Sequence, residues 1–365
     1  PIAIVPVDDP GPEATAVPTE EPAEEPAEEA TDQPSEVVVG EIVPFVSSQI
    51  SVMVPDNWNV DEGEFGTLLA IEDEPSGLTG EMQDFGDQFP GLLIFPIFEG
   101  QAEALIASMG DGAELVSVDR LSIEQGLPAL RIEFRNAENF DAVIDGVIYL
   151  YSSGSRAFGL FLGAPTEAWA QLVGTVDAVA GSLVFNESEV DLLVAGDEPL
   201  LVEDPEGEFS LTIPAGWITT PTQDEDLRVV VSDPDVRIVG AIALESDVSD
   251  DEQLQALTEA IAGALSEEDA AALANEVVSA LDLGQEGFEV DGTQTEIFPT
   301  EGESMGVIRI VGSIAIEEGP TMAMSLYIGI YTDSVAALIV FGEPAEVQGM
   351  EADLLDIIDS VVIAQ

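Results

Sequence analysis

Two stretches of the chain alternate hydrophobic and polar residues in the same order. Residues 50–58 read Ile-Ser-Val-Met-Val-Pro-Asp-Asn-Trp, and residues 209–217 read Phe-Ser-Leu-Thr-Ile-Pro-Ala-Gly-Trp. Alternation with a period of two predicts a strand with one buried face, and the proline predicts where that strand ends. A second pair of similar stretches, 160–165 and 339–344, follows in the same order. The repetition predicts two copies of one domain.

Further periodic segments complete each copy. In the first copy we expect strands over 127–134, 142–151 and 156–162 and helices over 101–109 and 166–180. Two apolar runs, 91–98 and 157–165, have the length of strands. In the second copy we expect strands over 293–298, 305–316, 321–331 and 336–341, a helix over 345–358, and two added helices that begin after Ser249 and Ser266. This pattern predicts an α+β fold in which helices cover mainly antiparallel sheets.

A proline-rich acidic arm precedes the two copies. Residues 8–36 hold proline, alanine, threonine and acidic residues without periodicity, which is typical of an extended, self-repelling tether. The tip of the arm is apolar, and we interpret it as a detachable strand that binds a partner. Its partner-binding residues are Ile2, Ala3, Ile4, Val5 and Val7.

The chain therefore divides into four predicted parts. These are the arm over 1–44, a first domain over 45–186, a linker over 187–206 and a second domain over 207–365. The linker segments 190–194 and 200–202 are too apolar for a free tether. We expect them to pack on a domain or to add a strand to it.

The charge of the chain limits its partners. Its 365 residues include 74 acidic and 7 basic ones, which gives a formal net charge of −67. Such a surface gains nothing by counterion release from nucleic acid, and anionic lipid headgroups repel it. Its self-repulsion falls at high ionic strength or when divalent cations bind between carboxylates, so we expect saline or calcium-rich surroundings. No apolar run approaches the roughly 18 residues that span a bilayer, so we expect no membrane span.

The missing residue types exclude most catalytic chemistry. The chain has no histidine and no cysteine, and all 7 basic residues are arginine. These absences exclude catalytic triads, Schiff bases, the P-loop lysine, disulfides and thiolate or imidazole metal sites. Among so many carboxylates, no pair stands out as the acid and base of a glycosidase. The sequence therefore predicts a protein without enzymatic activity.

A few residues remain as candidates for binding. Calcium needs only oxygen ligands, so Ca²⁺ held by surface carboxylates is the one cofactor that the sequence suggests. Three acidic clusters could supply them, none with EF-hand spacing: Asp56, Asp61, Glu62 and Glu64; Asp224, Glu225 and Asp226; Asp247, Asp250 and Asp251. Trp58 and Trp217 follow strand-ending prolines, which favours packing over the end of a core rather than stacking on a ligand. Asn186 begins a glycosylation sequon in the linker.

The repeated motif resembles the PsbP/Mog1 family. Its elements are a strand of the form Ser-x-x-apolar-Pro-x-x-Trp, then a hairpin sheet, then a helix that ends in Ser-Leu-Val at 182–184 or Ser-Val-Val at 360–362. The resemblance covers 45–186 and 207–363, and Asn57 stands where the family usually has glycine. It implies two tandem α/β/α sandwich domains. Members of the family are mostly binding or assembly modules, so the resemblance implies a scaffold and transfers no catalytic residue.

Together these features predict a secreted structural protein. The chain opens at Pro1 without a basic or apolar leader, so we expect a removed leader and an extracellular or cell-surface location. We expect the subunits to form a filament, sheath or surface layer, with Ile2–Val7 completing a sheet edge on the next subunit. A head-to-tail contact of this kind does not close, so the homo-oligomer is a polymer. The alternative is a monomeric secreted or cell-anchored binding module whose arm is an acidic stalk.

Overall fold

A computed structural model describes most of the chain after the arm. The described residues are 39–63, 67–85, 91–110, 112–139, 142–186, 190–221, 228–246, 288–290, 296–298, 306–315, 321–331 and 334–364. The chain divides into a unit of residues 1–35 and a compact unit of residues 36–365, and all described residues belong to the second. We call its residues 39–186 the first half and its residues 190–364 the second half.

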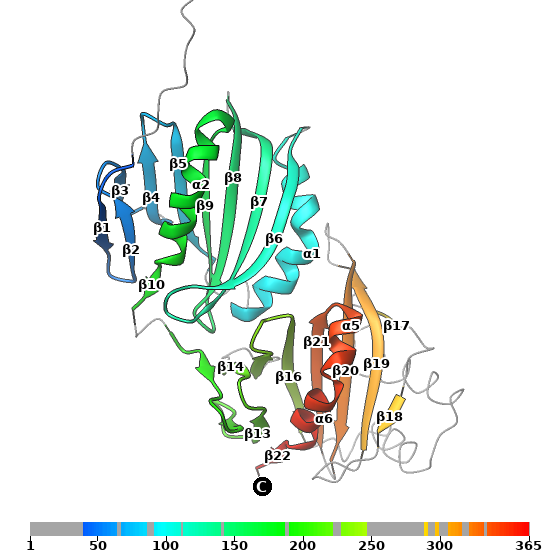
Figure 1. The fold of residues 1–365 in the computed structure, drawn as a ribbon. Helices are drawn as coiled ribbons and strands as arrows, with labels where there is room; N and C mark the ends of the chain where they lie inside the picture. The colour runs from blue at the N-terminus through cyan, green and yellow to red at the C-terminus, as the bar shows by residue number, and fades with distance from the viewer. Residues whose placement is uncertain are drawn as a thin grey trace, which may run out of the picture. The chain divides into compact units, whose positions relative to one another are not determined.

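The first half is built on a seven-stranded antiparallel sheet (Figure 1). The strands lie in the order β3-β4-β5-β9-β8-β7-β6. Their bounds are β3 (Asn59–Asp61), β4 (Thr67–Asp73), β5 (Leu78–Asp84), β6 (Glu114–Ser122), β7 (Pro128–Asn139), β8 (Ala142–Ser152) and β9 (Ala157–Pro165). Because successive side chains of a strand point to opposite faces, β8 contributes Tyr149 and Tyr151 to one hydrophobic core and Leu150 to another.

Two helices cover opposite faces of this sheet. Helix α1 (Ile94–Ala107) follows a short 3₁₀ helix, η2 (Gly91–Leu93), and packs on β6, β7 and β8. Helix α2 (Thr166–Gly181) packs on β8 and β9. Trp169, Leu172 and Val176 recur along α2 at helical spacing, and all three are buried in the core that holds the tyrosines of β8.

The second half is built on a nine-stranded antiparallel sheet. The strand order is β11-β14-β15-β16-β21-β20-β19-β17, and β18 also pairs with β19. The bounds are β11 (Leu193–Val194), β14 (Ile218–Pro221), β15 (Val229–Ser232), β16 (Ile238–Ser246), β17 (Phe288–Val290), β18 (Glu296–Phe298), β19 (Gly306–Ala315), β20 (Thr321–Ile330) and β21 (Ser334–Gly342). Helices α5 (Pro344–Gly349) and α6 (Glu351–Asp359) pack on β20 and β21, and Pro344 occupies the first position of α5, where its missing N–H costs nothing.

The same three-stranded sheet occurs once in each half. The first is β1-β2-β10 and the second is β12-β13-β22. The bounds are β1 (Ile42–Val46), β2 (Ile50–Pro55), β10 (Val184–Phe185), β12 (Leu200–Glu203), β13 (Phe209–Ile213) and β22 (Val362–Ile363). In both sheets the central strand leads to the proline before the tryptophan: β2 ends at Pro55, and β13 ends at Ile213, just before Pro214. The register also agrees, because Val184 lies opposite Ser51 as Val362 lies opposite Ser210.

A serine clamps the closing helix to this central strand in both halves. The Ser182 hydroxyl accepts a hydrogen bond from the Met53 N–H at 2.9 Å and donates to the carbonyl of Val179 at 2.7 Å. The Ser360 hydroxyl accepts from the Thr212 N–H at 2.8 Å and donates to a helix carbonyl at 2.7 Å. The serine of the repeated Ser-Leu-Val and Ser-Val-Val endings therefore satisfies a strand N–H and ties that strand to the last turn of the helix.

A shared hydrophobic core joins the two halves. It contains Leu92 and Phe95 of the first half together with Val230 and Val239 of the second. Val229 and Val231, which flank Val230 on β15, instead face the core beneath α6. The second sheet therefore buries one face under its own helices and the other against η2 and α1.

Several sequence predictions hold at the level of single elements. The expected strands of the first half appear as β7, β8 and β9, and the expected helix over 166–180 appears as α2. The apolar linker segments do add strands, because β11 pairs with β14 and β12 pairs with β13. The helices expected after Ser249 and Ser266 lie outside the described residues.

The predicted fold class is wrong. The described residues form a β-rich fold of four antiparallel sheets with few helices, and not two α/β/α sandwiches. The strands are longer and more numerous than the repeated motif indicates, since the linker and both short sheets add pairings. The helices are also placed differently: α1 begins at Ile94, inside the apolar run 91–98, and the expected helix over 345–358 is divided into α5 and α6 at Met350.

Candidate functional site

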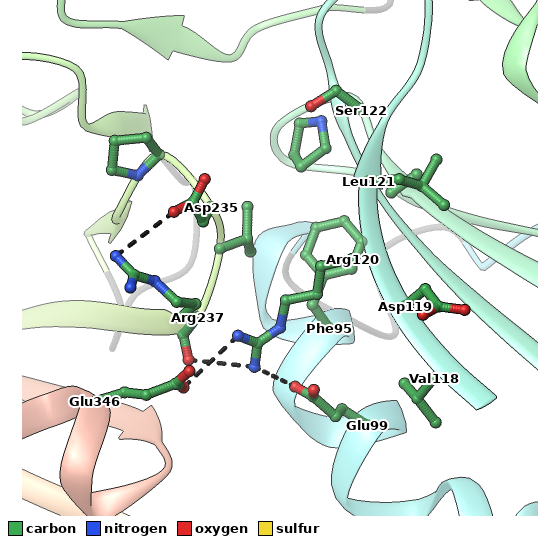
Figure 2. Close-up of a pocket in the computed structure, with 14 residues that line it drawn as sticks. Phe95, Glu99, Val118, Asp119, Arg120, Leu121, Ser122, Asp235, Arg237 and Glu346 are labelled. Carbon is green, nitrogen blue, oxygen red and sulfur yellow. Dashed lines mark hydrogen bonds and ion pairs between the residues drawn. The ribbon is translucent and has the colours of Figure 1, made fainter.

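A cleft of about 460 Å³ runs along β6, the outer strand of the seven-stranded sheet (Figure 2). One wall is residues 118–122 of β6, and Phe95 and Glu99 of α1 lie beside them. Residues 234–237, in the turn between β15 and β16, form the facing wall, and Glu346 of α5 closes one end. We call this space the β6 cleft. It combines residues from both halves of the compact unit.

Arg120 crosses the β6 cleft and connects the two halves. Its guanidinium pairs with Glu99 of α1, and its Nη1 lies 3.6 Å from the Glu346 carboxylate (Figure 2). Its Nη2 also donates to the backbone carbonyl of Arg237 at 3.4 Å. Arg120 and Glu99 line a second, smaller hollow of about 170 Å³ as well. One arginine thus links β6, α1, α5 and the turn of the second half.

The turn opposite β6 is held in a strained conformation. Val236 has a φ of +54°, a left-handed value that is rare for a β-branched residue and costs roughly 1–2 kcal/mol. Asp233 secures the turn, because its carboxylate accepts hydrogen bonds from the Ile238 N–H at 2.9 Å and from Arg237 Nε at 3.0 Å. The bond to Asp233 also raises the pKa of Arg237 above its ordinary value. In this strained turn, Val236 is buried in the core shared by the halves and also lines the cleft.

The charges of the β6 cleft leave it slightly acidic. Arg120 and Arg237 are opposed by Glu99, Asp119, Asp235 and Glu346. Both arginines form ion pairs with neighbouring carboxylates, so neither presents an isolated positive charge to a ligand. The remaining lining is mainly apolar. What the cleft offers to a ligand is therefore apolar contact and the backbone edge of β6.

The backbone of β6 has hydrogen-bonding groups directed into the cleft. The Ile123 N–H donates to the Leu127 carbonyl at 3.0 Å, one register position beyond the pair Ser122 and Pro128. Hydrogen-bonded and non-hydrogen-bonded pairs alternate along an antiparallel ladder, so residues 118, 120 and 122 direct their N–H and C=O groups away from β7. Pro128 has no N–H and lies opposite Ser122, which agrees with this alternation. No strand in the described ranges pairs with this outer edge.

A second cluster of polar residues lies beneath α2. Arg131 of β7 lies 2.9 Å from the Glu133 carboxylate and 3.1 Å from that of Asp177, and Tyr149 donates a short hydrogen bond to Asp177. Burial and the hydrogen bond to the charged carboxylate raise the pKa of the Tyr149 phenol above its usual range. Burial opposes the charge of Arg131, but its carboxylate partners outweigh that effect and raise its pKa. Arg131 and Tyr149 both bond to Asp177 of α2, so the cluster joins α2 to the sheet.

Most arginines of the chain are used in this way. Six of the 7 basic residues form ion pairs with described carboxylates: Arg120, Arg131, Arg156, Arg228, Arg237 and Arg309. Arg309 is buried beneath the helices of the second half, paired with Glu351 and placed over the ring of Phe298. The positive charges of these six arginines are therefore paired with carboxylates of the same chain.

The residues that the sequence analysis selected have different outcomes. Ile2, Ala3, Ile4, Val5 and Val7 lie outside the described residues, as do Glu64 and the second and third acidic clusters. Within the described ranges, no group of three or more acidic residues is arranged to hold a metal ion. Trp58 and Trp217 are buried in the two main cores, which confirms their packing role. The Asn186 side chain donates to the Ser48 carbonyl at 2.6 Å.

Sequence reasoning missed the β6 cleft. Arg120 and Arg237 are far apart in the chain, and only the fold brings them together. The rarity of cations was the available signal, because an arginine kept among so many acids is expected to have specific partners.

Comparisons with known proteins give a limited result. No family model matches the chain, and no curated protein matches it. Among solved structures, it is similar to the cyanobacterial PsbP (CyanoP) of Synechocystis sp. PCC 6803, with a TM-score of 0.33 and 14% identity over 41% of this chain and 96% of that one. PsbP is the family that the sequence motif resembles, and a likeness of this size carries no argument about function.

Two other solved structures cover more of the chain. One is a protein of Bacteroides thetaiotaomicron VPI-5482, with a TM-score of 0.23 and 13% identity over 78% of this chain and 89% of that one. The other is DynU16, from the dynemicin biosynthetic locus, with a TM-score of 0.15 and 9% identity over 78% of this chain and 96% of that one. Neither likeness supports a statement about activity. Among the helices that the structure describes, none is both long and apolar enough to cross a bilayer.

Proposed function

We propose that this protein is a non-enzymatic, secreted structural protein that self-assembles into an extracellular filament, sheath or surface layer. In this proposal the apolar tip of the arm, Ile2–Val7, joins a sheet edge of a neighbouring subunit. Main-chain hydrogen bonds supply the affinity, and the side-chain alternation of the tip fixes its register.

The observation that supports this function is where the fold exposes apolar side chains. Ten large apolar side chains are exposed among the described residues, and seven of them lie on the outer strands of the four sheets. These seven are Ile42 and Val46 on β1, Val116 on β6, Leu193 and Val194 on β11, Leu201 on β12, and Val362 on β22. Exposed, apolar outer strands are templates for pairing with another chain.

The charge of the protein makes such assembly depend on the ions in solution. Subunits of this acidity repel one another, so polymers should form where salt or divalent cations screen the carboxylates. The same charge keeps finished polymers apart in solution and limits lateral clumping.

Deletion of residues 1–7 tests the proposal. The matched control deletes residues 8–14, which shortens the arm by the same length but keeps the apolar tip. Both variants and the full chain are compared by light scattering and negative-stain microscopy at low salt, at molar salt and with millimolar calcium. We expect the full chain and the control to polymerise and the tip deletion to stay at the monomer mass of 38.4 kDa. Identical polymers without the tip would refute strand donation.

The alternative function is a monomeric binding module on an acidic stalk. The β6 cleft favours it, because a partly apolar cleft beside the outer edge of a strand can bind an extended peptide of another protein. A full chain that stays monomeric under all three conditions would support this alternative.

A further inference from the structure

The length of β6 separates it from the other outer strands. Strand β6 has nine residues. The other outer strands each have between two and five residues; they are β1, β3, β10, β11, β12, β17 and β22. Its pairing with β7 shifts register between Leu115 and Ser117 and is regular from Ser117 to Ser122. This regular part has six residues, the same number as the tip Ile2–Val7. In the described part of the chain, β6 is thus the outer strand that can pair with the whole tip.

We propose that the outer edge of β6, inside the β6 cleft, is the acceptor for the tip Ile2–Val7 of a second copy of this chain. This inference rests on the proposed function and names its binding site. The tip lies antiparallel to residues 116–121, with Ile4 opposite Asp119. Ala3 and Val5 then lie opposite Arg120 and Val118, whose N–H and C=O groups face the cleft.

The single proline of the tip is compatible with this register. A strand residue directs its N–H and C=O to one side, and the next residue directs them to the other side. Because Pro6 has no N–H, its nitrogen must face away from the acceptor, as it does at the edge of a sheet. The main-chain groups of Ile2 and Ile4 then also face away, and those of Ala3 and Val5 pair with the regular part of β6, while Val7 lies opposite Val116 at the register shift. All main-chain donors that the acceptor requires are present in the tip.

The chemistry of the cleft favours an uncharged segment. Half of its lining residues are apolar, and its carboxylates outnumber its arginines. Residues 1–7 carry no charged side chain, while the arm beyond them begins with Asp8 and Asp9 and is rich in acid. Burial of an acidic segment beside Glu99 and Glu346 would cost desolvation and repulsion. The tip is therefore the part of the arm that the cleft can accept.

The length of the arm permits a contact between subunits. At no more than about 3.3–3.6 Å per residue, the segment between the tip and β1, residues 8–41, spans up to roughly 120 Å. A tip that enters a neighbour leaves its own β6 cleft open for the next tip, so the contact propagates. Insertion of the tip into its own subunit would instead end growth.

The absence of cysteine allows a direct test by disulfide trapping. One variant carries Ile4→Cys and the other carries Asp119→Cys, whose side chain is 57% exposed. In the proposed register these residues form a non-hydrogen-bonded pair, whose Cα separation of about 4.5 Å permits a disulfide. The two variants are mixed in equal amounts under mild oxidation, so every heterodimer must join two subunits. The control replaces Asp119→Cys with Leu201→Cys, which is 62% exposed on β12.

We expect the mixture with Asp119→Cys to form disulfide-linked heterodimers at least tenfold faster than the control mixture. Equal rates, or faster linkage to Leu201→Cys, would overturn β6 as the acceptor. If polymer formation still requires residues 1–7, that result leaves strand donation intact, so the two failures are distinguishable. A chain that carries both Ile4→Cys and Asp119→Cys and closes into a linked monomer would overturn the intersubunit contact. Circular dichroism and tryptophan fluorescence establish that each variant is folded.

Discussion

Arg120 should couple the stabilities of the two halves, and a double-mutant cycle with Glu346 measures that coupling. The two side chains come from different halves and are 3.6 Å apart, with 21% and 31% of their surfaces exposed. At an effective dielectric constant of about 40, two unit charges at this distance attract by about 2 kcal/mol. Desolvation, side-chain entropy and screening leave a net coupling of about 1 kcal/mol for a partly exposed pair.

The cycle uses Arg120→Met, which keeps most of the apolar stem, together with Glu346→Gln and the double variant. Unfolding in urea, which leaves the ionic strength unchanged, is followed by tryptophan fluorescence. Trp58 and Trp169 report on the first half and Trp217 on the second. Because the halves share a core, we expect them to unfold in one transition.

Salt provides the decisive comparison. At molar salt the Debye length falls to about 3 Å, so the coupling should decrease to a few tenths of a kcal/mol, or about a third of its low-salt value. The matched control is the cycle of Arg237→Met with Asp235→Asn, which has the same distance of 3.6 Å but lies within one exposed turn. Its coupling should be smaller at every salt concentration. A coupling of zero between Arg120 and Glu346 at low salt would refute the role of Arg120 in joining the halves.

Two further predictions concern the repeated clamp and the polar cluster beneath α2. Ser182→Ala and Ser360→Ala should each lower the free energy of unfolding by about 1 kcal/mol, since each serine satisfies a backbone N–H. Urea unfolding measures both changes. If only one of the two substitutions lowered the free energy of unfolding, the clamps would not be equivalent. Because the pKa of Tyr149 is raised in the folded state, its contribution to stability is complete below the ordinary tyrosine pKa of about 10 and is lost as the pH rises further. Tyr149→Phe should therefore reduce the decline in unfolding free energy above pH about 10, and an unchanged decline would refute this assignment.

The periodicity of the sequence predicted elements well where burial is one-sided. The alternating residues 209–213 form a strand, β13, whose apolar side chains are buried. The apolar residues at helical spacing in α2 form its buried face. Periodicity does not distinguish a strand from a helix in the run 91–98. A short, continuously apolar run fits both a strand and a buried helix, and here it becomes η2 and the start of α1 because a second core lies on its other side.

The β6 cleft could not be predicted because it depends on contacts between distant segments. Its strained Val236 is an ordinary residue in the sequence, and only the packing of the two halves explains its backbone conformation. The fold class failed for a related reason. The repeated motif indicated sheets covered by helices, but it did not show how many short strands the linker and the chain ends add to those sheets.

The internal pairing of six arginines has a consequence for any material made from this protein. Because those cations are neutralised within the fold, the exterior is close to a polyelectrolyte of one sign. A network of such chains traps mobile counterions, and their osmotic pressure pushes neighbouring chains apart. The water content and thickness of a layer would then change with the salinity of its surroundings, swelling in dilute medium and contracting in brine, without any change in the fold.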